Sequence, residues 1–369
     1  MGNITEAEAR DVLGHSTGPV SATPLTHNPK NGVTAGVWTV TAGERTAVLK
    51  VLTRTKEATG RWAASDDPRH WNYWLREAQV YDSGLAQSWR PYGIRAPRLL
   101  ACVERADGDV ALWLEHVRGE PGTAWPLARH IEHARRLGAA QGAASVPDEP
   151  WLSHRFLRQY VDSNTLGEEL LDDDAAWQQP LVRDHFPAGL RHDMVRLHHD
   201  REWFLDVMEA LPRAFSHLDQ WPANVRTQDR DSVLFDWAFA GDGALGEDLG
   251  NYLPDSVFDL FVPAADLPGY AARAYDAYLH GLRESGSRVD ERLVRLGLCA
   301  SVVKYDWLTA AMLARASEAQ QLDYGGERAV SAELRYRERG LALAFLAGWA
   351  AEARALAPQV GFPEAPSGR

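Results

Sequence analysis

The sequence predicts an α+β fold, in which a small antiparallel sheet near the N-terminus is followed by a larger helical part. Residues 34–52 contain two strand-like apolar runs around a Gly-containing turn, and residues 98–117 repeat this arrangement. After the second hairpin, apolar residues recur at helical rather than strand spacing. We therefore expect two domains, an N-terminal lobe at residues 1–117 and a C-terminal lobe at residues 118–369.

The helices are predicted from local patterns. Acidic residues in the first turn favour a short helix at residues 5–13, and apolar residues at helical spacing before Gly84 favour another at residues 68–83. The remaining helical patterns all follow the second hairpin. They lie at residues 126–144, in a helical insertion at 151–211, and at 254–282, 291–316 and 333–357.

The charge of the chain excludes some classes of partner. Its 369 residues include 51 acidic and 39 basic side chains, which gives a formal net charge of −12. This charge argues against nucleic acid or an anionic membrane as partner, and it favours a cationic small molecule. The longest apolar segment, residues 293–316, is interrupted by charged residues, so we expect a buried helix there rather than a membrane span.

The cysteine content and the N-terminal residues favour a cytoplasmic location. Only Cys102 and Cys299 are present, so neither a disulfide framework nor a zinc site is expected, and a reducing compartment is the default. The first residues, MGNITEAEARDVLG, lack the basic start and apolar run of a signal peptide.

One stretch carries the residue types of phosphoryl transfer. His217, Asp219 and Asn224 form an H-x-D-x-x-x-x-N pattern, and Asp236 follows a short apolar run after the next turn. Phosphoryl transfer needs a carboxylate to orient the attacking hydroxyl and oxygen ligands to hold Mg²⁺ against nucleotide phosphates. The ordered set is more specific than any one of its members, each of which can arise by chance in an acidic protein.

A second set of candidate residues lies in the N-terminal part. Lys50 sits inside an apolar strand, where an ammonium needs a partner, and we expect that partner to be Glu77 on the next helix. The alternatives are a lysine that reaches solvent at a strand edge and a solvated glutamate. Gly32 and Gly36 would let backbone amides approach phosphates closely, although an ordinary hairpin explains them equally well.

These motifs resemble the aminoglycoside phosphotransferase and choline kinase family, within the protein-kinase-like superfamily. The resemblance rests on the H-x-D-x-x-x-x-N loop, on the Asp236-Trp237 pair and on the later Asp248-Leu249 pair, and it covers residues from about Gly32 to Leu249. It implies a bilobal protein-kinase-like fold and phosphorylation of a hydroxyl group with ATP, or less often GTP, and Mg²⁺.

The resemblance also implies a role for each candidate residue. Lys50, held by Glu77, would bind the α- and β-phosphates, and the backbone of a hinge that includes Glu115 and Val117 would meet the adenine. Asp219 would be the catalytic base or the group that orients the hydroxyl. The remaining roles are metal binding by Asn224 and Asp236, and support of the catalytic loop by His217 and Asp248.

The acceptor is predicted less closely than the nucleotide. Leu218 stands where the family usually has glycine, and Trp221-Pro222 fills the middle of the loop. The acidic stretch from Asp162 to Asp174 would attract a cationic acceptor such as an aminoglycoside antibiotic, although a solvated loop explains it at least as well. We expect a small-molecule hydroxyl as acceptor. The alternatives are a peptide Ser/Thr kinase in the biosynthesis of a modified peptide and a nucleotide-binding scaffold without catalysis.

Two histidine pairs stand out in the sequence, and the first of them invites a metal interpretation. His130 and His133 lie three residues apart on a predicted helix, but no third ligand is nearby in the sequence, so we expect surface histidines. His198 and His199 fall in a polar run and are also expected at the surface.

Overall fold

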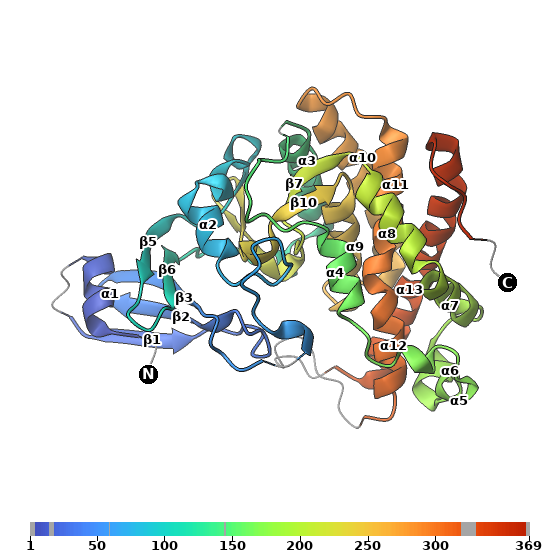
Figure 1. The fold of residues 1–369 in the computed structure, drawn as a ribbon, viewed down its shortest axis with the longest axis horizontal. Coiled ribbons are helices and arrows are strands. Elements are labelled where there is room, and N and C mark those ends of the chain that lie inside the picture. The colour runs from blue at the N-terminus through green and yellow to red at the C-terminus, as the bar shows by residue number, and fades with distance from the viewer. Residues whose placement is uncertain (1–3, 15–17, 59, 144, 319–329, 367–369) are drawn as a thin grey trace. The chain divides into compact units, whose positions relative to one another are not determined.

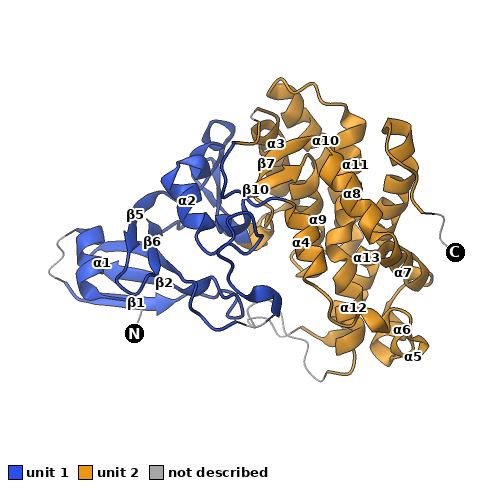
Figure 2. Cartoon of the chain, viewed as in Figure 1, with its two compact units in different colours: residues 1–121, 148–154, 224–240 blue, residues 122–147, 155–223, 241–369 orange. Residues whose placement is uncertain are grey.

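The structure is a computed structural model that describes residues 4–14, 18–58, 60–143, 145–318 and 330–366. The chain divides into two compact units (Figure 2). Unit 1 consists of residues Met1–Pro121, Asp148–His154 and Asn224–Ala240, and unit 2 contains the rest. The expected boundary at Val117 is close to Pro121, but unit 1 also takes in two later segments that hydrophobic periodicity does not signal.

Unit 1 is built on a five-stranded antiparallel sheet (Figure 1). The strands, in spatial order, are β1 (Val20–Pro24), β2 (Thr34–Ala42), β3 (Arg45–Leu52), β6 (Val110–Glu115) and β5 (Leu99–Glu104). Both predicted hairpins are present, and β1 adds an edge strand. Helix α1 (Glu6–Leu13) begins at Thr5, whose hydroxyl accepts a hydrogen bond from the Glu8 amide at 3.3 Å.

Side-chain alternation along the strands sets the two faces of this sheet. Leu49 and Val51 are fully buried in the core that α1 covers, together with Trp113 of β6. Lys50 lies between Leu49 and Val51 in β3, so its side chain points to the opposite face. The pattern that builds the core thus also directs the candidate lysine away from it.

The predicted helix at residues 68–83 is wrong over its first half, because α2 spans only Arg76–Asp82. The backbone carbonyls of Pro68, His70 and Trp71 accept hydrogen bonds from the Arg76 guanidinium, and the His70 carbonyl also accepts one from the Tyr73 amide within a turn. The apolar residues that suggested a helix are instead buried in an irregular segment, where Trp71 is 1% exposed.

A smaller sheet completes unit 1. Strand β9 (Asp231–Leu234) pairs in parallel with β4 (Ile94–Arg95) and antiparallel with β8 (Val225–Gln228). The β8–β9 hairpin follows Asn224 and leads directly to Asp236, and its place in unit 1 brings Asp236 to the same unit as Lys50.

Unit 2 is mainly helical, with one short two-stranded sheet (Figure 1). Strands β7 (Arg213–Ser216) and β10 (Gly241–Ala244) pair antiparallel. The helices are α3 (Leu127–Ala143), α4 (Phe156–Asp162), α5 (Asp174–Trp177), α6 (Pro180–His185), α7 (Leu190–His199), α8 (Arg201–Ala210), α9 (Glu247–Phe258), α10 (Leu267–Glu284), α11 (Glu291–Ala300), α12 (Asp306–Arg315) and α13 (Ala332–Leu356).

The prediction of one helix at residues 254–282 is wrong. Helix α9 ends at Phe258, where Leu260 adopts a left-handed conformation (φ 61°), and α10 starts at Leu267 with a proline in its first turn. Glycine lets α10 approach α3 closely, because a Cβ on Gly281 would lie 1.9 Å from the carbonyl oxygen of Arg135.

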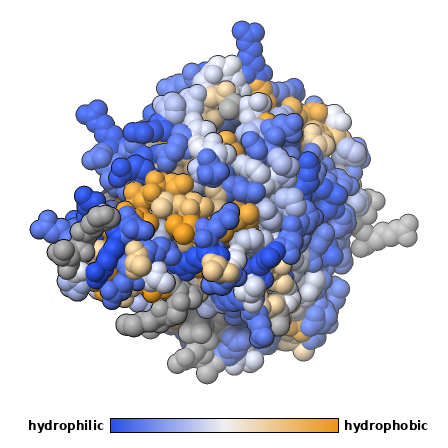
Figure 3. Space-filling model, turned by 60° about the vertical axis from the view of Figure 1, so that its left-hand side comes forward, coloured by the Kyte–Doolittle hydropathy of each residue, from blue (hydrophilic) through white to orange (hydrophobic). Residues whose placement is uncertain are grey.

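Two helical stretches of the described chain are long and apolar enough to cross a membrane by length and composition alone, Glu291–Arg315 and Ala332–Val360. The first is 94% buried inside the protein, as a core helix is. On the face seen in Figure 3, hydrophilic residues surround an apolar area. The large hydrophobic side chains exposed among the described residues are Leu25, Leu100, Leu166, Leu334 and Leu341.

Candidate active site

The Lys50 ammonium lies between two carboxylates in unit 1. Its Nζ is 2.5 Å from Glu77 Oε2 and 2.7 Å from Asp236 Oδ1, and the residue is only 8% exposed. Burial alone would lower the pKa of Lys50, but the charges of Asp236 and Glu77 outweigh it and raise the pKa above its usual value. The pairing of Lys50 with Glu77 is as expected from the sequence, and Asp236 is a second partner.

The backbone at Asp236 aims its carboxylate at Lys50. Asp236 follows β9 in the left-handed conformation (φ 60°, ψ 65°), which is uncommon for residues other than glycine and costs about 1–3 kcal/mol. The next residue, Trp237, is fully buried, and its Nε1 donates a hydrogen bond to the carbonyl of Leu234 at 3.0 Å. The Asp236 side chain stays 44% exposed, so one edge of its carboxylate can accept another ligand.

Asn224 lies beside Asp236 at the open end of the β8–β9 hairpin. The carbonyl of Asn224 accepts a hydrogen bond from the Phe235 amide at 2.8 Å, and the next pair in the register is Val225 with Leu234. An amide oxygen and a carboxylate are the ligand types that Mg²⁺ takes in nucleotide sites. The donor set of unit 1 therefore fits a hard divalent cation held by Asn224 and Asp236.

Unit 2 holds Asp219 on a tightly braced loop after β7. His217 and Leu218 are fully buried, whereas Asp219 is half-buried, and its amide donates to His217 Nδ1 at 3.3 Å. Leu218 has φ 66°, the left-handed conformation that glycine adopts without strain, which explains why a glycine is usual there. The buried ammonium of Lys304 interacts electrostatically with Asp255 and Asp219. Burial alone would lower the pKa of Lys304, but the charges of these nearby acids outweigh it and raise the pKa.

Asp248 holds this loop from behind. Its carboxylate accepts hydrogen bonds from the backbone amides of His217 (2.9 Å) and Leu218 (2.7 Å), and from the Gln141 side chain at 2.9 Å. Burial raises the pKa of Asp248 to about 6, although the two amide bonds oppose this rise. Gln141 was not predicted, because a single polar residue in an amphipathic helix looks like a solvated one.

The prediction of His130 and His133 as surface residues is wrong, since each is 1% exposed. His133 Nε2 lies 3.0 Å from Oε1 of Gln220, which directly follows Asp219. The Gln220 amide nitrogen faces Asp248 Oδ2 at 3.4 Å, so its oxygen is the acceptor and His133 the donor. Burial lowers the pKa of both His130 and His133 to about 4. Sequence spacing alone did not indicate this support for the loop.

The prediction for the second pair is wrong for His198 but holds for His199, which is exposed. His198 is half-buried, and its Nδ1 lies 2.9 Å from Asp306 Oδ2. Glu168 also approaches this pair, and one ligand atom from each of the three lies within 4.8 Å of the others. However, Arg201 already pairs with Glu168 at 2.8 Å. Its positive charge disfavours a metal cation at these three residues.

Arginines also partly neutralise the acidic stretch at residues 162–174. Asp174 pairs with Arg191 at 2.5 Å, as Glu168 does with Arg201, and both arginines come from later helices. The absence of basic residues along the stretch in the sequence therefore overstates its negative potential.

The glycines and the hinge residues occupy defined positions in unit 1. The Gly32 amide donates to the carbonyl of Trp62 at 2.8 Å, and a Cβ on Gly36 would overlap the Trp38 ring. Glu115 pairs with Arg95 at 2.9 Å, and Val117 is buried. Close packing thus accounts for both glycines in this structure, and contacts of these four residues with a nucleotide remain predictions.

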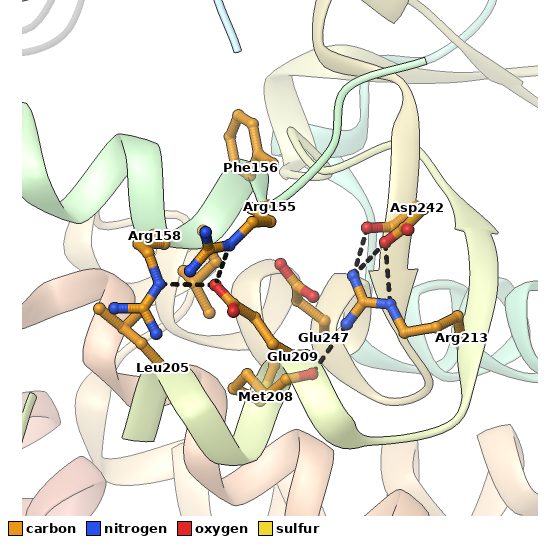
Figure 4. Close-up of a pocket in the computed structure, with 10 residues that line it drawn as sticks. Arg155, Phe156, Arg158, Leu205, Met208, Glu209, Arg213, Asp242 and Glu247 are labelled. Atoms are coloured by element: carbon orange, nitrogen blue, oxygen red, sulfur yellow. Dashed lines mark hydrogen bonds and ion pairs between the residues drawn. The ribbon is translucent and has the colours of Figure 1, made fainter. Parts of the chain in front are cut away.

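One small pocket in unit 2 has a different set of lining residues (Figure 4). Arg158 and Arg213 line it, and each is paired with an acid, Glu209 at 2.6 Å and Asp242 at 2.8 Å. Burial raises the pKa of the adjacent Glu247 to about 7. Because none of the predicted site residues lines this pocket, we do not assign it to the candidate active site.

Together, the antiparallel sheet with its Lys50–Glu77 pair and the helical unit with its catalytic-type loop define a protein-kinase-like fold. No protein-family model and no curated protein matches the sequence. Solved structures do match. A spectinomycin phosphotransferase in complex with ADP and spectinomycin is 11% identical, and the match covers 94% of this chain and 99% of that chain with a TM-score of 0.51.

Two further structures are similar. A protein from Ralstonia eutropha described as an aminoglycoside phosphotransferase is 12% identical, with a TM-score of 0.50 over 93% of this chain and 97% of that chain. An amicoumacin kinase in complex with AMP-PNP and Ca²⁺ is 14% identical, with a TM-score of 0.48 over 97% and 94% of the two chains. The predicted fold class, and the likeness to aminoglycoside phosphotransferases at the level of the fold, are confirmed.

Proposed function

We propose that the protein transfers the γ-phosphate of ATP to a hydroxyl group of a small molecule. The observation that carries this proposal is the Lys50 ammonium, buried between the carboxylates of Glu77 and Asp236 at 2.5 and 2.7 Å. A buried cation beside a partly exposed acid suits a triphosphate and its metal better than it suits a packed core.

In this proposal each candidate residue has a defined role. Lys50 binds the α- and β-phosphates, and Glu77 keeps its side chain in place. Asn224 and Asp236 hold Mg²⁺, which neutralises charge on the phosphates when bound. Asp219 accepts a hydrogen bond from the acceptor hydroxyl, orients its oxygen and takes its proton as this oxygen bonds to the γ-phosphorus and the bond from that phosphorus to the leaving ADP breaks.

The proposed acceptor is a small molecule, with cationic antibiotics such as aminoglycosides as the first candidates. The net charge of −12 supports a cation, and so does the likeness to a spectinomycin phosphotransferase. The acidic stretch adds less support than the sequence implied, since arginines pair with Glu168 and Asp174. We keep ATP as the nucleotide and the cytoplasm as the location in this proposal.

Acceptor-stimulated release of ADP tests the proposal. The assay uses the full chain with Mg·ATP and a panel that includes aminoglycosides, spectinomycin, choline, homoserine and a serine-containing peptide. We expect at least one small alcohol to stimulate ADP release, and Asp219→Asn to reduce this turnover by about 10²–10⁴-fold. Asp229→Asn is the matched control, because it makes the same change at an exposed turn residue.

The outcomes separate the alternatives. Stimulation by the peptide alone would replace the small-molecule proposal with a peptide kinase. Tight binding of ATP without turnover of any acceptor would indicate a scaffold. Equal turnover by the wild type and Asp219→Asn would refute the role of Asp219.

A further inference from the structure

Arg76 begins α2, directly before Glu77, and it is completely buried. In the described part of the chain its five hydrogen bonds all go to backbone carbonyls, so no acid balances its charge by direct contact. Burial lowers the pKa of Arg76 to about 9, which still leaves the guanidinium charged at neutral pH. A buried cation of this kind is costly unless every donor is used.

The five carbonyls come from three segments of unit 1 that are distant in sequence (Figure 2). They are those of Pro68 (2.9 Å), His70 (2.6 Å), Trp71 (2.9 Å), Trp151 (2.8 Å) and Ala238 (3.0 Å). A guanidinium has five N–H donors, so the full donor capacity of Arg76 is used. Because Ala238 is two residues after Asp236, Arg76 fixes the backbone that carries the proposed metal ligand.

Apolar packing acts on the same backbone. Trp71 is 1% exposed and lies between two aromatic rings, with centroid distances of 5.5 Å to Trp62 and 5.4 Å to Phe239. Ser153 adds two hydrogen bonds, from its hydroxyl to the Phe239 carbonyl (2.7 Å) and from its amide to the Ala240 carbonyl (3.1 Å). Residues 238–240 are therefore held by side chains from two other segments.

The described residues that connect β3 to α2, 53–58 and 60–75, also hold the loop between β1 and β2. The Gly32 amide donates to the Trp62 carbonyl at 2.8 Å, and Lys56 Nζ donates to the carbonyls of Asn31 and Thr34, each at 2.9 Å. Asn72 Nδ2 adds a bond to Asn31 Oδ1 at 3.2 Å. In a kinase-like sheet the β1–β2 loop covers the nucleotide phosphates. The residues between β3 and α2 therefore contact this loop and also, through Trp71, the residues that follow Asp236.

We propose that Arg76, together with Lys56, Trp62 and Asn72, forms a clamp that positions Asp236 and the β1–β2 loop for binding of the metal-nucleotide complex. Arg76 is a positioning residue in this scheme, since it acts through the backbone of residues 238–240 and touches neither metal nor nucleotide. The inference rests on the proposed function, because it assumes that Asp236 binds Mg²⁺. The new element is that Arg76 sets the position of the Asp236 carboxylate before any nucleotide binds.

The test compares Arg76→Lys with Arg69→Met. Lysine keeps the charge but has three donors on a flexible stem, so it cannot satisfy five carbonyls in three segments. Arg69 lies in the same segment but its side chain is exposed, which makes Arg69→Met a control for removal of an arginine. The measurements are calorimetric affinity for AMP-PNP, with Mg²⁺ and with EDTA, and hydrogen exchange of the amides of residues 236–240 without nucleotide.

We expect Arg76→Lys to weaken Mg²⁺-dependent binding of AMP-PNP by about 10–100-fold. We also expect faster exchange at residues 236–240, while binding with EDTA changes much less. Arg69→Met should behave as the wild type. The proposal is overturned if Arg76→Lys lowers the melting temperature but leaves the Mg²⁺-dependent gain in affinity and the exchange at residues 236–240 unchanged.

A milder variant covers the case in which Arg76→Lys fails to fold. Ser153→Ala removes only the hydroxyl bond to the Phe239 carbonyl, and we expect the same two changes at a few-fold size. Failure of the clamp and failure of the proposed function give different results. If the wild type binds no Mg·AMP-PNP, the proposed function fails, and the exchange rates still show whether Arg76 and Ser153 hold residues 236–240.

Discussion

Replacing His133 with glutamine should make the protein less sensitive to acid. Burial lowers the pKa of His133 to about 4 in the folded protein, whereas the ordinary value is 6.5. The folded state therefore favours neutral His133, which stabilises the protein fully above pH 6.5 and progressively less as the pH falls towards 4. The full difference of about 2.5 pKa units corresponds to about 3 kcal/mol, of which about 2 kcal/mol is lost between pH 7.5 and pH 5.

Glutamine removes this titration but keeps an N–H donor for the Gln220 side chain. Urea unfolding gives the loss of unfolding free energy between pH 7.5 and pH 5 for each protein. Comparing this loss between wild type and His133→Gln cancels the contribution of other buried groups such as Asp248. We expect wild type to lose about 2 kcal/mol more than His133→Gln over this interval. The exposed His199 provides the control, and His199→Gln should lose as much as wild type. Equal losses in wild type and His133→Gln would refute the neutral, buried state of His133.

Two further substitutions test the packing of each unit. Lys50→Met leaves the buried Glu77 without its cation, so we expect urea unfolding to show a loss of about 3–5 kcal/mol in stability. Adding Glu77→Gln to the same chain should partly restore this stability. A loss below about 1 kcal/mol for Lys50→Met would contradict the buried pair. Gly281→Ala should cost about 1–3 kcal/mol, because its Cβ would lie 1.9 Å from the Arg135 carbonyl. Gly269→Ala in the same helix has open space and should be neutral or stabilising by up to about 1 kcal/mol, and equal effects of the two would contradict the close approach of α3 and α10.

Residues that act through local patterns could be predicted from the sequence. The hairpin that carries Lys50 follows from strand alternation and a glycine turn, and the buried ammonium required an acid, which the structure provides in Glu77. The catalytic role of the loop from His217 to Asn224 stays a prediction, which rests on an ordered set of polar residues that is rare by chance. The support of that loop by the Asp248 carboxylate is present as hydrogen bonds to two of its backbone amides.

Residues that act through long-range hydrogen bonds could not be predicted. Arg76 looks like a solvated helix residue in the sequence, because nothing local shows that its partners are carbonyls of three segments. Gln220 and His133 are polar residues whose burial depends on how α3 packs on the loop after β7. The helix expected at residues 68–83 was wrong for a related reason, since the Arg76 guanidinium takes the carbonyls that a helix would use.

Transfer of label from γ-labelled ATP to an acceptor oxygen tests the central claim most directly. The acceptor is the one that stimulates ADP release most strongly, and the enzymes are the wild type, Asp219→Asn, Asp236→Asn and the control Asp229→Asn. We predict one labelled phosphate ester per ADP for the wild type and the control, and a loss of at least about 10²-fold for Asp219→Asn and Asp236→Asn. Release of ADP without ester, or equal labelling by all four proteins, would contradict the account.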